Sequence, residues 1–332
     1  MSVLVTGGAG YIGSHMVWEL LDAGEEVVVL DRLSTGFDWA VAPEAKLVVG
    51  DIADRERVGQ IIAAEKVDAI IHFAGSVVVP DSVSDPLAYY DNNTVKTRAL
   101  IEAAVRGGVR HFIFSSTAAV YGSAGAEPVA EDHPLSPASP YGRSKLMSEW
   151  MLADAAAAHD FAYTALRYFN VAGADPRGRT GQSTRGATHL IKVASEAALG
   201  KRSHLDVFGT DYPTPDGTCI RDYIHVGDLV AAHRLALKRL REGGGSLVAN
   251  CGYSRGYSVL DVVDAVRRAT GRDFEVRMSG RRAGDAVSVV ADSTRARAEF
   301  GWQPKLDDLD LIVEHALSWE RSLATRNTAV SG

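Results

Sequence analysis

The chain has 332 residues, of which 46% are hydrophobic and 23% are charged, as is ordinary for a folded globular protein. Its formal net charge of -7 argues against a basic nucleic-acid-binding surface, and no apolar run reaches the length of a transmembrane helix. We therefore expect a small-molecule partner, no nucleic acid, no membrane and, because no basic and apolar leader opens the chain, a cytoplasmic location.

Short apolar runs recur along the first half of the sequence, and helix-like stretches separate most of them. Continuous apolar strands that alternate with helices are typical of βαβ units, in which helices cover both faces of a parallel sheet. The pattern predicts an α/β protein with a Rossmann-type, doubly wound parallel sheet. The expected strands are residues 2–6, 26–31, 46–51, 68–75, 111–116 and 163–170, and the expected helices are residues 11–23, 54–65, 86–107 and 144–159.

The length exceeds the size at which one hydrophobic core usually divides, so two lobes are expected. Residues 1–170 form the doubly wound domain, and residues 171–324 form a smaller, mixed α/β lobe that binds the substrate. Such a lobe closes over the carboxyl edge of the sheet and makes a cleft. Segments near 225–241 and 285–300 are expected to return to the first domain, and residues 325–332 to form a flexible tail.

The sequence has two cysteines, Cys219 and Cys251, without a CxxC spacing and without clustered histidines. This pattern argues against a disulfide framework and against a structural metal site. We expect both thiols to be reduced and packed in the interior, and no metal.

A glycine-rich turn follows the first expected strand. The stretch "VTGGAGYIGSH" places Gly7, Gly10 and Gly13 in a GxxGxxG spacing at the opening of a helix. Glycines there permit a tight turn and let the backbone approach a pyrophosphate, whose charge the helix N-terminus favours. Asp31 ends the second strand, eighteen residues beyond Gly13, where a carboxylate would accept hydrogen bonds from the adenine ribose. The spacing predicts a dinucleotide site, and Asp31 favours NAD over NADP because it would repel a ribose 2′-phosphate.

Neighbouring residues extend this prediction. Arg32 could accommodate that phosphate, but it could equally be exposed or lie along the adenine. Asp51 and Ile52, which end the third strand, are placed to meet the adenine. Residues 73–75 end the fourth strand and would let the backbone approach the pyrophosphate side.

A tyrosine and a lysine lie four residues apart in "SPYGRSK", just after a proline. Pro140 suits the first turn of a helix, so Tyr141 and Lys145 are expected on one helical face. A phenol is a poor proton acceptor at neutral pH unless a positive charge favours the phenolate, and Lys145 is placed to supply that charge. The pair is a candidate catalytic base with its activating cation.

Six ordered motifs carry a resemblance to a known family. They are "TGGAGYIGSH", "SSTAAVYG", "SPYGRSK", "LRYFN", "DGTCIRDYIHV" and "RRAGD", and the similarity runs from about residue 2 to about residue 320. Together they resemble the extended short-chain dehydrogenase/reductases, and within them the enzymes that epimerise UDP-hexoses at C4. The resemblance implies that the first domain holds NAD tightly and that the smaller lobe binds a UDP-sugar.

The resemblance also implies a mechanism. Tyr141, as phenolate, would take the proton of the sugar 4-hydroxyl while C4 passes hydride to NAD, which gives a 4-keto sugar. The keto sugar would swing about its link to the diphosphate, and hydride would return to the opposite face of C4, so that UDP-galactose and UDP-glucose interconvert. Thr117 would hydrogen-bond O4 and bridge to Tyr141. Lys145 would hold the nicotinamide ribose and lower the pKa of Tyr141.

The family motifs further imply the binding residues. A bidentate guanidinium suits phosphate oxygens, a carboxylate suits ribose hydroxyls, and Phe208 would line the uracil pocket. The implied cofactor-binding residues are Gly7, Gly10, Tyr11, Ile12, Gly13, Asp31, Arg32, Asp51, Ile52, Phe73, Ala74, Gly75, Asn92, Ser115, Tyr141, Lys145, Tyr168 and Phe169. The implied substrate-binding residues are Thr117, Asn170, His189, Leu190, Phe208, Arg221, Arg282 and Asp285.

Three positions depart from the family pattern. Val77 stands where many relatives carry a Lys toward the cofactor phosphates, and His189 stands where relatives carry an Asn beside Leu190. Val289 lies where some relatives place a large aromatic residue against the sugar pocket. The smaller side chain could leave room for an N-acetyl group, so a UDP-N-acetylhexosamine is an alternative substrate, as is a UDP-pentose.

Other functions are weighed against epimerisation. Nucleotide-sugar 4,6-dehydratases place an acid and a base directly after the active-site Thr, where this sequence has Ala118 and Ala119, and neither can transfer a proton. A non-enzymatic NAD-binding relative could lose Tyr141 or Lys145 without penalty, but both are present. A dehydrogenase that releases reduced cofactor is a third alternative. The resemblance also implies a homodimer, in which the helices at 86–107 and 144–159 could pack as a four-helix bundle.

Overall fold

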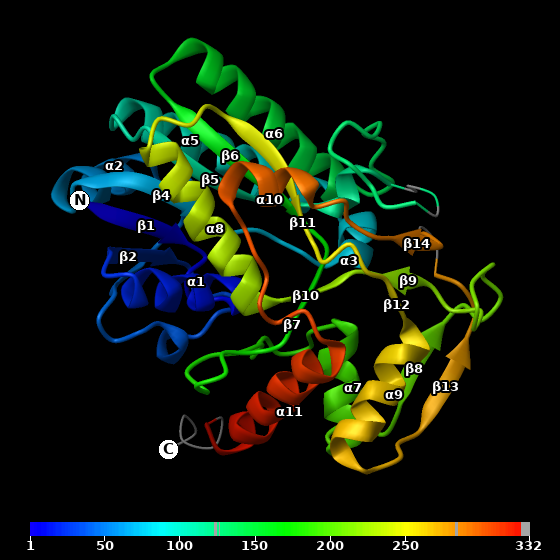
Figure 1. The fold of residues 1–332 in the computed structure, drawn as a ribbon. Coiled ribbons are helices and arrows are strands. Elements are labelled where there is room, and N and C mark those ends of the chain that lie inside the picture. Colours follow the sequence, from blue (N-terminus) through cyan, green and yellow to red (C-terminus); the bar gives the residue numbers. More distant parts are fainter. Residues whose placement is uncertain (123–124, 126, 283–284, 327–332) are drawn as a thin grey trace.

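A computed structural model describes residues 1–122, 125, 127–282 and 285–326. A seven-stranded parallel sheet forms the centre of the larger lobe, with the strand order β11-β6-β5-β4-β1-β2-β3 (Figure 1). The predicted doubly wound α/β fold is confirmed. The strands are β1 (Ser2–Thr6), β2 (Glu26–Asp31), β3 (Lys46–Val49), β4 (Val67–His72), β5 (His111–Thr117), β6 (Ala162–Tyr168) and β11 (Leu247–Cys251).

Helices cover both faces of this sheet because its strands are apolar on both sides. On β1, Val3 and Val5 pack in the core shared with α1 and α8, whereas Leu4 packs in the core shared with α2, α5 and α6. Alternate side chains of one strand therefore pack into two different hydrophobic cores, one on each face of the sheet. The helices are α1 (Tyr11–Asp22) and α8 (Val226–Arg241) on one face, and α2 (Arg55–Ala64), α5 (Lys96–Arg106) and α6 (Pro140–Ala158) on the other.

The start of α6 follows the predicted logic. Ser139 is the N-cap and its Oγ accepts a hydrogen bond from the Gly142 amide at 3.2 Å, while Pro140 occupies the first turn. A side-chain cap satisfies an amide that the helix leaves unpaired, and proline has no amide to satisfy. The helix therefore begins four residues earlier than the expected 144–159, and its first turn carries Tyr141.

The helix expected at 86–107 consists of three pieces: α4 (Pro86–Tyr90), the π-helical turn η2 (Asp91–Val95) and α5. A π turn inserts an extra residue into a helix and often lies at a functional site. Here it carries Asn92 and Asn93. The short helix α3 (Val79–Ser84) and the 3₁₀ helices η1 (Asp38–Ala40) and η3 (Ala118–Val120) lie in connecting segments.

The expected strand 163–170 also divides. β6 ends at Tyr168, and β7 (Asn170–Ala172) leaves the large sheet to pair in parallel with β10 (Tyr223–His225). The chain thus leaves the large sheet after Tyr168. Asn170 lies just beyond that point.

The smaller lobe packs α7, α9 and α11 together beside two short sheets (Figure 1). β8 pairs with β13, and β9 pairs with β12 and β14. The bounds are α7 (Leu190–Ala198), α9 (Val259–Thr270), α11 (Leu309–Arg326), β8 (Leu205–Phe208), β9 (Ile220–Arg221), β12 (Tyr257–Ser258), β13 (Val276–Ser279) and β14 (Ser288–Val289).

Two later segments lie on the larger lobe. α8 contacts β5 and β6, and α10 (Thr294–Phe300) contacts α8 and β11. These are the segments in which the sequence predicted a return to the first domain, although β14 pairs within the smaller lobe. Of the tail expected at 325–332, the first two residues end α11 and the others lie outside the described residues.

Candidate active site

The glycine-rich turn packs so tightly that a side chain cannot replace Gly7 or Gly13. Gly7 has a φ of +73°, and a Cβ there would lie 2.6 Å from the Ala74 amide nitrogen. A Cβ on Gly13 would lie 2.1 Å from the Gly7 carbonyl oxygen. Helix α1 begins at this turn with no acidic residue in its first turn and no side-chain cap on its amides. An open helix N-terminus beside a close backbone turn fits a pyrophosphate, so these residues fit a bound dinucleotide.

Asp31 closes this turn from the end of β2. Its Oδ2 accepts a hydrogen bond from the Ala9 amide at 3.0 Å, and its Oδ1 accepts one from the Leu33 amide at 2.8 Å. Each carboxylate oxygen has a second lone pair, so these bonds orient the group without exhausting its capacity toward a ribose. Tyr11, in the first turn of α1, donates its hydroxyl to the Gly173 carbonyl at 2.7 Å and so joins this turn to the chain beyond β7.

Asp51 forms a charge cluster at the expected adenine end of the sheet. Lys96 Nζ contacts its Oδ2 at 2.7 Å and Arg32 Nη1 contacts the same oxygen at 3.4 Å. Burial works to raise the pKa of Asp51, but the Lys96 bond, the Ala53 amide and the two cations lower it on balance. Arg32 is therefore exposed and paired with Asp51. Sequence reasoning missed Lys96, whose position depends on the π turn just before it.

The loop after β4 lies against helix α6 and the π turn η2. A Cβ on Gly75 would lie 3.1 Å from Asn93 Oδ1 and 3.6 Å from Lys145 Nζ. Asn93 is 2% exposed, and it accepts a hydrogen bond from the Ser76 amide at 2.7 Å and donates to the Ser76 carbonyl at 2.9 Å. The predicted Asn92 donates to Ser76 Oγ at 2.9 Å. Both asparagines hold this loop, and the sequence pointed to only one of them.

Thr117, Tyr141 and Lys145 meet at the carboxyl end of β5, as the sequence predicted. Tyr141 is 7% exposed and lies beside Thr117, whose hydroxyl oxygen accepts a bond from the Ala119 amide at 3.1 Å. Burial raises the pKa of Tyr141, and the bond from Thr117 lowers it in part. The hydroxyl pair is placed to bind one substrate oxygen.

Lys145 reaches the same site from one turn further along α6. It donates a hydrogen bond to the Ser115 carbonyl at 3.0 Å, and its Nζ lies 4.9 Å from the centre of the Phe114 ring. Burial lowers the pKa of Lys145 to about 8, so the ammonium form dominates at neutral pH. The role of Lys145 in lowering the pKa of Tyr141 stays a prediction.

Aromatic residues lie beside this pair. Tyr168 hydrogen-bonds Ser115, and burial together with the neighbouring Tyr141 raises its pKa. His233 of α8 lies 5.0 Å from Phe73 and 6.3 Å from Tyr168 between ring centres. The predicted Phe169 and Ile52 are buried as well. His233 was missed because nothing in an amphipathic helix distinguishes a site-facing His from a packed one.

Four predicted substrate residues come together in the smaller lobe. The Arg282 guanidinium lies 4.6 Å from the centre of the Phe208 ring, and its Nε lies 3.0 Å from Asp285 Oδ2. Arg221 Nη2 lies 3.9 Å from Asp285 Oδ1. Asn170 is exposed at the turn between the lobes, and its amide donates to the Asp222 carbonyl at 2.9 Å. An aromatic face with two cations and one carboxylate suits a base, a diphosphate and a ribose.

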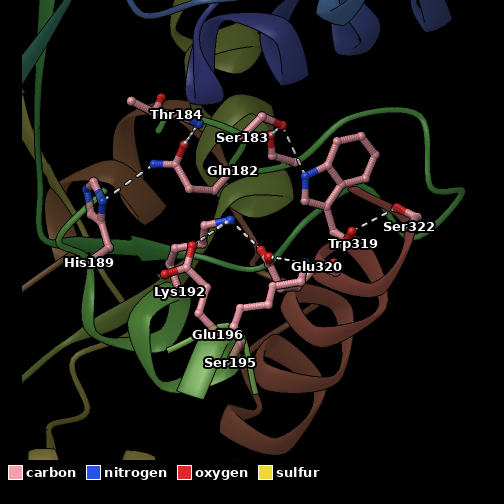
Figure 2. Close-up of polar contacts among 12 residues, drawn as sticks. Gln182, Ser183, Thr184, His189, Lys192, Ser195, Glu196, Trp319, Glu320 and Ser322 are labelled. Atoms are coloured by element: carbon pink, nitrogen blue, oxygen red, sulfur yellow. Dashed lines mark hydrogen bonds and ion pairs between the residues drawn. The ribbon is translucent and has the colours of Figure 1, made fainter. Parts of the chain in front are cut away.

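His189, which is drawn in Figure 2, immediately precedes α7. Leu190 is the first residue of that helix. Gln182 Oε1 accepts a bond from the Thr184 amide at 3.1 Å, which turns the Gln182 amide nitrogen toward His189 Nδ1 at 3.4 Å. Nδ1 then accepts, so Nε2 carries the proton and is a donor. The residue His189 is exposed at the surface. The protein around its ring removes part of the ring's hydration, and this loss lowers the pKa of His189.

The remaining sequence observations are also located. Val77 is 50% exposed, and Val289 packs against the cluster that contains Ala118 and Phe169. Cys219 and Cys251 are both free and buried. Within the described ranges, no group of three or more His, Cys, Asp or Glu side chains is placed to hold a metal ion, and no helix is long and apolar enough to cross a membrane.

The fold and this site define an NAD-dependent enzyme class. The sequence profile of the NAD dependent epimerase/dehydratase family matches residues 3–252, and the chain belongs to this family. The family resemblance predicted from the motifs is confirmed, as is the dependence on NAD.

The relatives with names are nucleotide-sugar 4-epimerases. The UDP-glucose 4-epimerase of Azospirillum brasilense is 56% identical over 97% of this chain and 92% of its own length. The crystal structure of UDP-glucose 4-epimerase from Brucella ovis in complex with NAD is 45% identical, with a TM-score of 0.93 over 96% of this chain and 97% of that one. The UDP-Glc/GlcNAc 4-epimerase of Campylobacter jejuni is 48% identical, with a TM-score of 0.84 over 97% and 99%.

Proposed function

We propose that this protein interconverts UDP-galactose and UDP-glucose by reversible epimerisation at C4, with NAD held through turnover. The observation that carries the proposal is the buried Tyr141 beside Thr117 at the end of β5, with Lys145 bonded to the Ser115 carbonyl of the same strand. A buried phenol paired with a hydroxyl is suited to bind a sugar hydroxyl and move its proton. The near full-length likeness to UDP-glucose 4-epimerases supports the same reaction.

In this proposal the chain's own residues bind the sugar and move one proton. NAD, when bound, supplies a hydride acceptor that later serves as the donor. Thr117 and Tyr141 hold the 4-hydroxyl of the substrate, and the Tyr141 phenolate removes its proton as C4 is oxidised to a ketone. After the 4-keto sugar turns over about its diphosphate link, Tyr141 returns the proton to O4 as C4 is reduced on its other face. No net oxidation results.

The UDP part of the substrate fits the smaller lobe. We assign the diphosphate to Arg221 and Arg282, the uridine ribose to Asp285 and the uracil to Phe208, with Asn170 and the Leu190 amide at the sugar-diphosphate end. Arg282 stacks on Phe208 and pairs with Asp285, so the guanidinium is already oriented before substrate binds. We assign His189, at the start of α7, as a further hydrogen-bond donor to this end through its Nε2.

The experiment described below can also detect two other reactions, which are epimerisation of an N-acetylated sugar and elimination of water. The small Val289 beside Ala118 supports an N-acetylated sugar as a second substrate, and one similar protein is named a UDP-Glc/GlcNAc 4-epimerase. Water elimination is disfavoured because Ala118 and Ala119, which follow Thr117, carry no proton-transfer group.

The deciding experiment is to incubate the purified protein with UDP-galactose and no added cofactor. UDP-glucose is expected to appear, and the same final ratio is expected when UDP-glucose is the starting sugar. UDP-N-acetylgalactosamine and a UDP-pentose, run in parallel, establish the range of sugars. Absence of an epimer from every sugar, even with NAD supplied, would reject the proposal, and a product lighter by one water would assign the chain to dehydration.

We further propose that the protein is a homodimer joined through the α5 and α6 side of the sheet. A groove between these helices is lined by apolar residues that include Ile101 and Met151 and by several charged side chains of both signs. Trp150 of α6 and Val95 just before α5 are 56% and 55% exposed. Large apolar side chains that are half exposed on neighbouring helices are typical of a protein contact.

Trp150→Glu is expected to turn the dimer into a monomer in sedimentation velocity, because a charge cannot be buried in an apolar contact without a partner. Met278→Glu is the matched control, since Met278 is also 56% exposed but lies on β13 of the smaller lobe. A wild-type protein that sediments as a monomer at micromolar concentration rules the dimer out.

A further inference from the structure

A buried ion pair joins α6 to β6 two helical turns beyond Tyr141. Arg167 of β6 donates from Nε to Glu149 Oε1 at 3.0 Å and from Nη2 to Glu149 Oε2 at 2.6 Å. The two side chains are 4% and 5% exposed. The proposed mechanism does not use either charge. Burial of two charges is costly unless the geometry is good and the remaining hydrogen-bonding groups are satisfied, so such a pair needs an explanation.

The pair is the centre of a larger buried network. Ser116 Oγ donates to Glu149 Oε1 at 2.5 Å, and Arg167 Nη1 donates to the Tyr121 hydroxyl at 3.0 Å. The Tyr121 hydroxyl in turn donates to Asn250 Oδ1 of β11 at 2.7 Å. One set of bonds thus joins β5, β6, β11 and α6. None of these side chains appears among the described buried polar atoms that lack a hydrogen-bond partner.

The sequence positions of the network tie it to the active site. Tyr141, Lys145 and Glu149 follow one another at four-residue steps and lie on one face of α6. On the sheet, Ser116 pairs with Arg167 in the β5–β6 register, and the next pair is Thr117 with Tyr168. Glu149 therefore binds the strand residues immediately before those that face the proposed substrate and cofactor. It fixes both the rotation of α6 and its height above the two strands.

We infer that the Glu149–Arg167 pair is a positioning device that holds Tyr141 within hydrogen-bonding distance of Thr117. The inference rests on the roles proposed above for Tyr141 and Thr117. The pair acts through geometry rather than through its charge: the influences on the pKa of Tyr141 are burial, which raises it, and the Thr117 bond, which lowers it. A displacement of about 1 Å between reacting groups can cost about 100-fold in rate, so a rigid anchor two turns away has a catalytic effect.

The experiment compares kcat, KM and the pH profile of UDP-galactose epimerisation for Glu149→Gln and the wild type. Glutamine keeps the size of the side chain but loses the charge that holds Arg167. We expect kcat to fall by about 10- to 100-fold while KM changes little. Because the Thr117 bond lowers the pKa of Tyr141, a looser bond raises that pKa, and the acid limb of the kcat profile moves to higher pH.

The charged and titratable groups around Tyr141 do not confound this readout. They are Lys145 on the same helix, Tyr168 on β6 and Tyr89 on α4. Burial raises the pKa of both tyrosines, which stay neutral through the range measured. The titration of Lys145 is common to every variant, so a difference in the acid limb reports on Tyr141.

Glu320→Gln is the matched control. Glu320 of α11 is 3% exposed and binds Lys192 of α7 (Figure 2) and, at 2.5 Å, Lys201. Its loss removes a comparably buried ion pair from the other lobe. We expect it to lower the melting temperature without moving the acid limb. An equal shift in Glu149→Gln and Glu320→Gln would reduce the Glu149 pair to general stability and overturn the inference.

Ser116→Ala keeps the test informative if Glu149→Gln does not fold. It removes one bond to Glu149 and leaves the ion pair intact, so a smaller fall in kcat and a smaller upward shift of the limb are expected. An unchanged kcat and limb in the folded Ser116→Ala protein would overturn the inference. Tyr141→Phe tests the proposed role of Tyr141 separately. If this variant were fully active, Tyr141 would not be the base, whatever the ion pair does.

Discussion

Tyr141→Phe is expected to lower kcat for UDP-galactose epimerisation by about 100- to 10,000-fold, the range that a positioned acid–base group contributes. Phenylalanine keeps the ring and its packing, because Tyr141 is buried and only the hydroxyl bonds Thr117. KM should change little, since the UDP part of the substrate is held in the other lobe. Steady-state kinetics with UDP-galactose measures both constants.

Two companion variants separate catalysis from binding. Arg282→Ala removes the guanidinium that stacks on Phe208 and should raise KM with kcat largely kept.

Thr117→Val keeps the side-chain volume but removes the bond that lowers the pKa of Tyr141, so the acid limb of the kcat profile should move to higher pH. A Tyr141→Phe enzyme with wild-type kcat would mean that another group takes the proton.

The strands and glycines of the first domain could be predicted because each follows from one local rule. A continuous apolar run has to be covered on both faces, and this is the case for β1, whose five residues are all buried. A GxxGxxG turn before a helix has few roles other than an anion site. The four-residue step from Tyr141 to Lys145 likewise requires only helical geometry.

The features that the sequence did not reveal depend on distant partners. β11 includes Asn250, a polar residue in a buried strand, and this is tolerated only because Tyr121 and the Val129 carbonyl satisfy its amide. The π turn that presents Asn93 and Lys96 interrupts a pattern that reads as one helix. The contact of Arg221 with Asp285 was predicted only from the family motifs, because no periodicity relates Arg221 to residues so far along the chain.

Gly13→Ala should abolish tight NAD binding. A Cβ at this position would lie 2.1 Å from the Gly7 carbonyl oxygen and 2.8 Å from the Gly8 Cα, both of which are backbone atoms of the glycine-rich turn. The turn has to move away from α1, and the helix N-terminus then no longer meets the pyrophosphate. Bound NAD per chain, measured after denaturing the purified protein, should fall at least about 10-fold.

Gly59→Ala is the control for this change, because it makes the same substitution inside a helix where the new methyl group meets nothing within 4 Å. Alanine is favoured over glycine in a helix by about 1 kcal/mol, so Gly59→Ala should raise the melting temperature and leave bound NAD unchanged. Gly13→Ala gains the same propensity but has to displace the turn, and its melting temperature should fall. Full NAD occupancy in Gly13→Ala would show that the close contact between Gly13 and Gly7 does not shape the cofactor site.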